Sequence, residues 1–177
     1  FSKAYDPAVL QPAYDPQKTI ERLEDAGWYD RDGDGILDKD GVPLEFEFLH
    51  VAGKQGAQLL SAELPQALAV AGIKMTIKTL EFASLIERMR ERDFDAYQLA
   101  WILDQESDPE QVWHSRWAQA ERSSNFIGFG DAECDQLIEA IQIELDIPKR
   151  MALWRRLHGR IAALQPYLFA YNNPYKF

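Results

Sequence analysis

Three stretches of the first half of the chain carry apolar residues in the pattern of β-strands. Residues 44–51 read Leu-Glu-Phe-Glu-Phe-Leu-His-Val, and residues 73–79 alternate apolar and polar side chains. A period of two places every second side chain on the same face of a sheet, so both stretches are predicted to be strands. The apolar run at residues 94–102 predicts a third strand.

Helical patterns separate these strands. Residues 56–71 space leucines by four, and residues 82–89 place apolar side chains on a 3.6-residue period. Pro65 lies inside the first pattern, so a kink or a break is expected there, and Gly72 is expected to end the helix. Strand, helix, strand, helix, strand predicts an α/β fold: a parallel-rich sheet flanked by helices, with right-handed crossovers.

Further helices are expected on both sides of this unit. Asp15-Pro16 predicts a capped helix start, with Gly27 at its end. A short helix is expected around 110–114 and two longer ones at 132–144 and from Pro148, the last capped by Asp146. Their predicted inward side chains are Leu137, Ile138, Ile141, Trp154, Leu157, Ile161 and Leu164.

The apolar run at residues 167–171 predicts a final strand after Gln165-Pro166. Residues 1–14, which are rich in Pro, Tyr and Asp, are expected to form an extended lead-in to a single α/β lobe over residues 15–177.

Composition excludes several classes of protein. A hydrophobic content of 46% is sufficient for a packed core, and a net charge of −10 argues against nucleic acid as a partner. Cys134 is the single cysteine, so no intrachain disulfide can form, and its helical setting predicts a small buried thiol. The sequence contains no run of 18 apolar residues, so no membrane span is predicted.

Short motifs distributed along nearly the whole chain resemble one family in their order. They are Tyr14-Asp15-Pro16-Gln17-Lys18, Ala26-Gly27-Trp28, Asp32-Gly33-Asp34-Gly35-Ile36, Ala71-Gly72-Ile73-Lys74-Met75, Arg92-Asp93-Phe94-Asp95-Ala96, Trp101 to Pro109, Asn125-Phe126-Ile127-Gly128-Phe129 and Gln165-Pro166-Tyr167-Leu168-Phe169. This ordered set is similar to the bacterial extracellular solute-binding proteins of the peptide/nickel-binding family, which serve ATP-driven importers.

The resemblance implies a longer protein with two lobes that close on a ligand, of which this chain is most of the carboxyl-terminal lobe. Its implied partners are a peptide or other small solute, the amino-terminal lobe, and the membrane permease of an ABC importer. The implied location is the periplasm, or the outer face of the cell with a membrane anchor. Both ends of the chain are typical of a domain fragment, without a signal sequence at Phe1.

The loop that follows the third strand is the first place to expect a ligand, because parallel sheets bind ligands beyond the carboxyl ends of their strands. The resemblance implies that Asp104, three residues after Trp101, receives the α-ammonium group of a peptide. A carboxylate forms a strong charge-assisted bond with an ammonium, and a tryptophan ring offers an apolar or cation–π wall. The alternative is a solvated loop acid at Asp104 and a core side chain at Trp101. Asp108 is either a further ligand residue or the cap of the helix that begins at Pro109.

An acidic turn is the weak candidate for a metal site. Asp30, Asp32, Asp34 and Asp38 resemble the start of a calcium loop, but Gly41 stands where a bidentate glutamate is needed. The alternative is a turn-rich hairpin in which Asp and Gly satisfy turn geometry.

Three functions compete on these residues: solute capture for import, a calcium-stabilised structural or interaction module, and hydrolysis by the three acids Asp104, Glu106 and Asp108. Nothing supplies a nucleophile, and the neighbours His114 and Ser115 are not a triad signature, so no enzyme and no cofactor are expected. His50 lies on the apolar face of its strand, where a hydrogen-bonded core histidine is expected.

Overall fold

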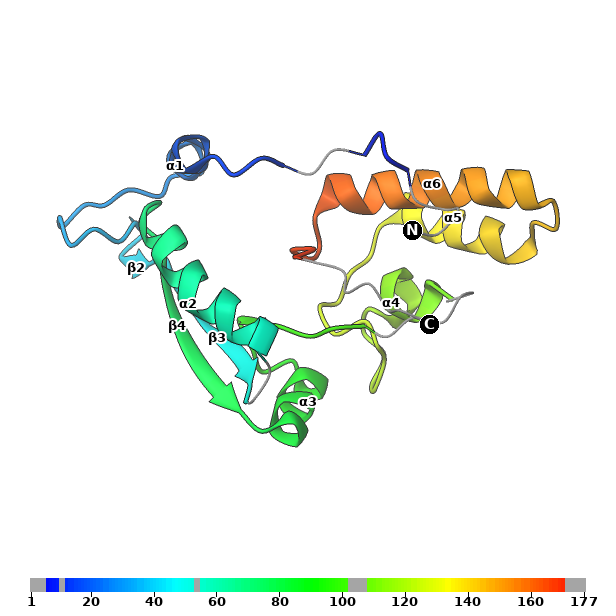
Figure 1. The fold of residues 1–177 in the computed structure, drawn as a ribbon. Coiled ribbons are helices and arrows are strands. Elements are labelled where there is room, and N and C mark those ends of the chain that lie inside the picture. Colours follow the sequence, from blue (N-terminus) through cyan, green and yellow to red (C-terminus); the bar gives the residue numbers. More distant parts are fainter. Residues whose placement is uncertain (1–5, 10–11, 53–54, 102–107, 171–177) are drawn as a thin grey trace. The chain divides into compact units, whose positions relative to one another are not determined.

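The computed structural model describes residues 6–9, 12–52, 55–101 and 108–170, with the backbone alone for 55–61. The chain divides into two compact units (Figure 1). One unit comprises residues 13–103, and the other joins residues 1–12 to residues 104–177. In the described residues no helix is long and apolar enough to cross a membrane.

The first unit is built on a parallel three-stranded sheet. Its strands β3 (Glu45–Val51), β4 (Lys74–Leu80) and β5 (Ala96–Tyr97) lie in the order β4-β3-β5. The β3–β4 ladder runs in register from the pair Glu45 and Lys74 to the pair Val51 and Leu80. The parallel α/β arrangement predicted from the alternating pattern is therefore confirmed.

The third strand is much shorter than the predicted 94–102. Its ladder contains only the pairs Phe48–Ala96 and Leu49–Tyr97. Just before β5, the Asp95 carboxylate accepts the backbone N–H of Glu47 at 2.9 Å, so a side-chain oxygen takes the place of a backbone carbonyl there. On the other side, the ladder ends with the N–H of Gln98 donating to the carbonyl of Leu49 at 3.2 Å.

Two helices pack on this sheet. Helix α2 (Gln55–Ala69) contacts β3 and β4, while α3 (Phe82–Glu91) contacts β3 and buries Leu85 and Met89. Helix α2 continues across Pro65, so a break there is not what the structure shows. A proline removes one helical hydrogen bond, and the bonds on either side together with packing on the sheet maintain the helix.

The amino-terminal part of this unit contains α1 (Pro16–Asp25) and the hairpin of β1 (Asp38–Lys39) with β2 (Val42–Pro43). Asp15 caps α1 by accepting the N–H of Lys18 at 3.0 Å, as predicted. Gly72, which follows α2, accepts the N–H of Leu37 with its carbonyl at 2.8 Å. Its φ of +72° and the nearness of the Leu37 side chain both require glycine.

The second unit packs two antiparallel helices. Helices α5 (Ala132–Ile143) and α6 (Ile147–Leu164) follow α4 (Glu110–Trp113) and a 3₁₀ helix at Ser115–Trp117. The core contains most of the predicted inward residues: Cys134, Leu137, Ile138, Ile141, Leu157 and Ile161 are buried, with Trp154 partly buried against them. Asp146 caps α6 as predicted.

Two expectations for the end of this unit are wrong. Leu164 is 41% exposed because α6 extends past the start of α5. Arg160 lies opposite Asp131, the residue before α5, and Leu164 is one helical turn further along α6. Residues 167–170 form no strand. The rings of Tyr167 and Phe169 instead pack on Trp113, with centroids 4.9 and 6.4 Å from its ring.

Candidate functional site

Trp101 follows the carboxyl end of β5 by four residues, and ligands of parallel sheets bind beyond that end of the strands. Its side chain is 38% exposed, so it is not the fully buried core residue of the alternative interpretation. Asp104 and Glu106 lie outside the described residues. The role of Asp104 as a ligand residue therefore stays a prediction.

Asp108 lies at the start of α4, in the second unit. Its Oδ1 accepts the N–H of Glu110 at 2.9 Å and lies 3.4 Å from the side-chain amide of Gln142. This geometry is that of a carboxylate closing the first turn of a helix. A contact of Asp108 with a solute stays a prediction.

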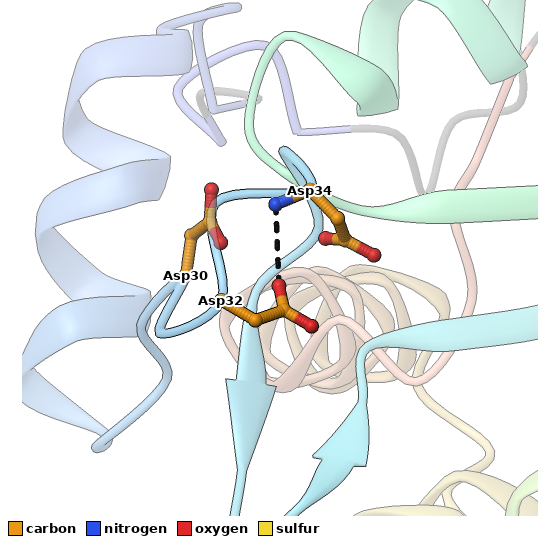
Figure 2. Close-up of side chains that lie close together, drawn as sticks. All are labelled: Asp30, Asp32 and Asp34. Carbon is orange, nitrogen blue, oxygen red and sulfur yellow. Dashed lines mark hydrogen bonds between the residues drawn. The ribbon is translucent and has the colours of Figure 1, made fainter.

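The acidic loop brings three of the four candidate calcium ligands together. Oxygens of Asp30, Asp32 and Asp34 lie within 4.8 Å of one another on the surface (Figure 2). Asp30 accepts the N–H groups of Gly33 at 2.7 Å and Gly35 at 3.0 Å. Asp32 accepts the N–H of Asp34 at 3.2 Å, and Asp34 accepts that of Ile36 at 2.8 Å.

Asp38, the fourth candidate, is engaged differently. Its carboxylate binds the Arg31 guanidinium at 2.7 Å and accepts the backbone N–H of Arg31 at 3.1 Å. These hydrogen bonds lower the pKa of Asp38 below its ordinary value. The loop therefore closes through side-chain to backbone bonds and one ion pair, as the hairpin interpretation predicts, and it offers a cation three exposed carboxylates rather than four.

The sheet contains two buried polar atoms, one on His50 and one on Gln98, whose lack of a hydrogen-bond partner among the described residues was not evident from the sequence. His50 is 4% exposed, as expected for a core residue, but within the described part of the chain its Nδ1 has no hydrogen-bond partner. The described protein groups therefore do not supply the hydrogen bond expected at this atom. Oε1 of Gln98 is likewise buried and without a partner among the described residues.

A second buried histidine, His114, lies in a polar cluster beside α5. Its Nδ1 accepts the N–H of Arg116 at 3.2 Å, and its Nε2 lies 3.3 Å from the Glu139 carboxylate. The hydroxyl of the neighbouring Ser115 donates to Asp135. The serine and the histidine thus each contact an acid of α5, and these contacts connect the segment that follows α4 to that helix.

Comparison with known proteins identifies the family. The family described as bacterial extracellular solute-binding proteins, family 5 Middle, matches residues 1–123. This chain belongs to that family. Among curated family 5 relatives, the oligopeptide-binding protein AppA of Bacillus subtilis (strain 168) is 30% identical over 160 residues, which make up 89% of this chain and 29% of AppA.

Solved structures confirm the fold expected of a family 5 solute-binding protein. AppA from Bacillus subtilis, in complex with a nonapeptide, has a TM-score of 0.85 and 29% identity over 94% of this chain. An oligopeptide-binding protein from Thermus thermophilus, complexed with a pentapeptide, has a TM-score of 0.82 and 22% identity over 93% of this chain. NikZ from Campylobacter jejuni, in complex with Ni(L-His), has a TM-score of 0.78 and 20% identity over 90%. The chain spans 33, 31 and 32% of these three structures, respectively.

Proposed function

We propose that this chain is the carboxyl-terminal lobe of a solute-binding protein that captures a peptide outside the cytoplasm and delivers it to the permease of an ABC importer. The observation that carries the proposal is the likeness to AppA, which extends over 94% of the chain and whose solved structure holds a nonapeptide. The calcium-stabilised module is not favoured, because no comparison points to it and the acidic loop uses its carboxylates in its own turns.

In this function no covalent bond is broken. The amino-terminal lobe supplies the opposite wall of the cleft, and closure of the two lobes excludes water around the peptide. Asp104 receives the peptide ammonium, Trp101 forms an apolar wall beside it, and Asp108 lies at the end of the same loop. Asp104 and Asp108 act in binding, not as a hydrolytic acid and base.

The test compares free and acetylated peptides in the full-length protein. Replacing Asp104 with Asn removes the charge that the ammonium needs, so affinity for a free peptide should fall by about 10- to 100-fold. The same change should leave the affinity for the N-acetylated peptide nearly unaltered, because that peptide has no ammonium group. Titration calorimetry measures both, with Glu106→Gln in the same loop as the matched control. Equal losses for the two peptides would remove Asp104 from the ammonium site.

A further inference from the structure

His50 and Gln98 occupy neighbouring positions on one face of the sheet. The ladder pairs Phe48 with Ala96 and Leu49 with Tyr97, and the N–H of Gln98 then bonds the carbonyl of Leu49. His50 and Gln98 are next in this register. Because side chains alternate along both strands, the two share the face that carries Phe48 and Ala96.

Each of these side chains has a buried polar atom that is unpaired among the described residues: Nδ1 of His50 and Oε1 of Gln98. His50 as a whole is 4% exposed. Buried polar atoms in folded proteins nearly always bond a protein group or an ordered water, because leaving them unpaired is costly. Two such atoms in adjacent register positions are best satisfied by one shared partner.

We propose that Nδ1 of His50 and Oε1 of Gln98 bind one buried water molecule, which links the carboxyl end of β3 to the residues that follow β5. The amide oxygen accepts only, so the water donates one hydrogen to Gln98. Towards His50 the water accepts from Nδ1–H, or donates its second hydrogen when the proton is on Nε2. A water with two polar partners fits a site closed to solvent, whereas a larger solute does not reach atoms buried to this degree.

The bridge lies where the backbone ladder has just ended. The ladder between β3 and β5 contains two residue pairs, and Gln98 is the first residue beyond them. Trp101 follows three residues later. The water therefore adds a link at the base of the segment that leads to the ligand residues, and His50 and Gln98 are positioning residues for Trp101. This last step rests on the proposed function, whereas the water site does not.

A double-mutant cycle in the full-length protein tests the water site. His50→Phe and Gln98→Met keep the approximate size of each side chain and remove its polar atoms. Urea unfolding at pH 7 should show a lower midpoint for each single variant, because each leaves the other polar atom unpaired. The double variant should lose less than the sum of the two. A raised midpoint in either single variant, or additive losses, would overturn the shared water.

The cycle of His50→Phe with Thr79→Val is the matched control. Thr79 is the register partner of His50 on β4, so this cycle measures the coupling that cross-strand contact alone produces, and the coupling of His50 with Gln98 should exceed it. A crystal structure of the wild-type protein gives a readout that does not depend on folding of the variants: a water bonded to both atoms supports the site, and a direct bond between the two side chains overturns it.

Peptide affinity distinguishes the buried water site from the positioning role of His50 and Gln98. A weaker affinity in both single variants, with Trp101 displaced, supports the positioning role. Coupled losses of stability with unchanged peptide affinity support the water site and overturn the positioning role. If the wild-type protein binds no peptide, the proposed function fails while the unfolding cycle still decides the water site.

Discussion

Asp131, the residue before α5, binds Arg160 near the end of α6 through two hydrogen bonds. Nη2 of Arg160 donates to Oδ2 at 2.7 Å, and Nε donates to Oδ1 at 3.1 Å. Oδ1 also accepts the N–H of Cys134 at 3.0 Å, which caps the first turn of α5. The hydrogen bonds from Arg160, followed by that from Cys134, hold the pKa of Asp131 well below its usual range.

This pair makes the stability of the helical unit depend on pH. Asp131→Asn keeps an oxygen that can cap the helix but removes the charge, so it should lower the free energy of unfolding by about 1 kcal/mol at pH 7. Because the pKa of Asp131 is lower in the folded state, its carboxylate stabilises the folded state at pH values above the unfolded-state pKa of about 3.9. This stabilisation is lost progressively as the pH falls below that value towards the folded-state pKa. Urea unfolding between pH 7 and pH 3 should show the gap between wild type and variant narrowing. The more exposed Glu133→Gln is the control, and a gap independent of pH would contradict the assignment.

Cys134 should resist thiol reagents in the folded protein. Its side chain is fully buried in the helical core, and burial, with Asp131 beside it, raises the pKa of the thiol to about 12. The thiolate is the reactive form, so Ellman's reagent at pH 8 should label the native protein only as fast as it unfolds. The same reagent in concentrated urea should label the single cysteine completely. Rapid labelling without denaturant would show that the helical pair opens readily.

Gly72→Ala should destabilise the sheet unit by about 1–3 kcal/mol. Gly72 has a φ of +72°, and an added Cβ would lie 2.7 Å from Cγ of Leu37. Gly41 is the matched control, because its φ is +77° while nothing lies within 4 Å of its added Cβ. Gly41→Ala therefore measures the backbone strain alone. Equal losses in the two variants, by urea unfolding, would show that the Leu37 contact contributes nothing.

Asn125 is a fully buried residue whose side chain satisfies a turn. Its Nδ2 donates to the carbonyl of Phe129 at 2.7 Å, and its Oδ1 accepts the N–H of Phe129 at 2.8 Å. Asn125→Leu keeps the branched shape of the side chain but leaves the carbonyl and the N–H of Phe129 unpaired, so it should cost about 2–4 kcal/mol in denaturant unfolding. Asn125→Asp keeps the acceptor but buries a charge opposite the Phe129 carbonyl, so at pH 7 it should cost at least as much. A loss below about 1 kcal/mol in either variant would place the stability of this turn elsewhere.

The isolated chain of 177 residues should bind peptides far more weakly than the full-length protein. In the proposed function, affinity depends on closure of two lobes, and this chain supplies one of them. Calorimetry of both proteins against the same peptides measures the difference. Comparable affinities would mean that the residues needed for capture are all present in this lobe.

The sequence predicted elements whose signals are local. Asp15 and Asp146 cap the helices that they were expected to cap, and the periodicity of residues 132–144 placed Leu137, Ile138 and Ile141 in the core. The strands at residues 45–51 and 74–80 also followed from local alternation. These features depend on neighbouring residues, so a single sequence contains them.

The errors have a common physical cause. An apolar run shows that a segment is to be buried but does not name the partner that buries it. Tyr167 and Phe169 pack on Trp113 rather than pairing as a strand. The unpaired atoms of His50 and Gln98 depend in the same way on the register between two distant strands, which no local pattern encodes. Of the candidate ligand residues, Trp101 follows β5 as the strand pattern predicted, and the binding roles of Trp101 and Asp104 stay predictions.

The two ladders of the sheet differ in length, and this sets the order in which the sheet comes apart. Seven residue pairs join β3 to β4, whereas two join β3 to β5. The amide hydrogens of β4 that bond β3 are therefore expected to exchange with solvent only in large openings, while that of Gln98 exchanges after a small local separation. The segment that carries Trp101 can thus loosen while the rest of the sheet stays intact, which in the proposed function would let a peptide leave without unfolding of the lobe.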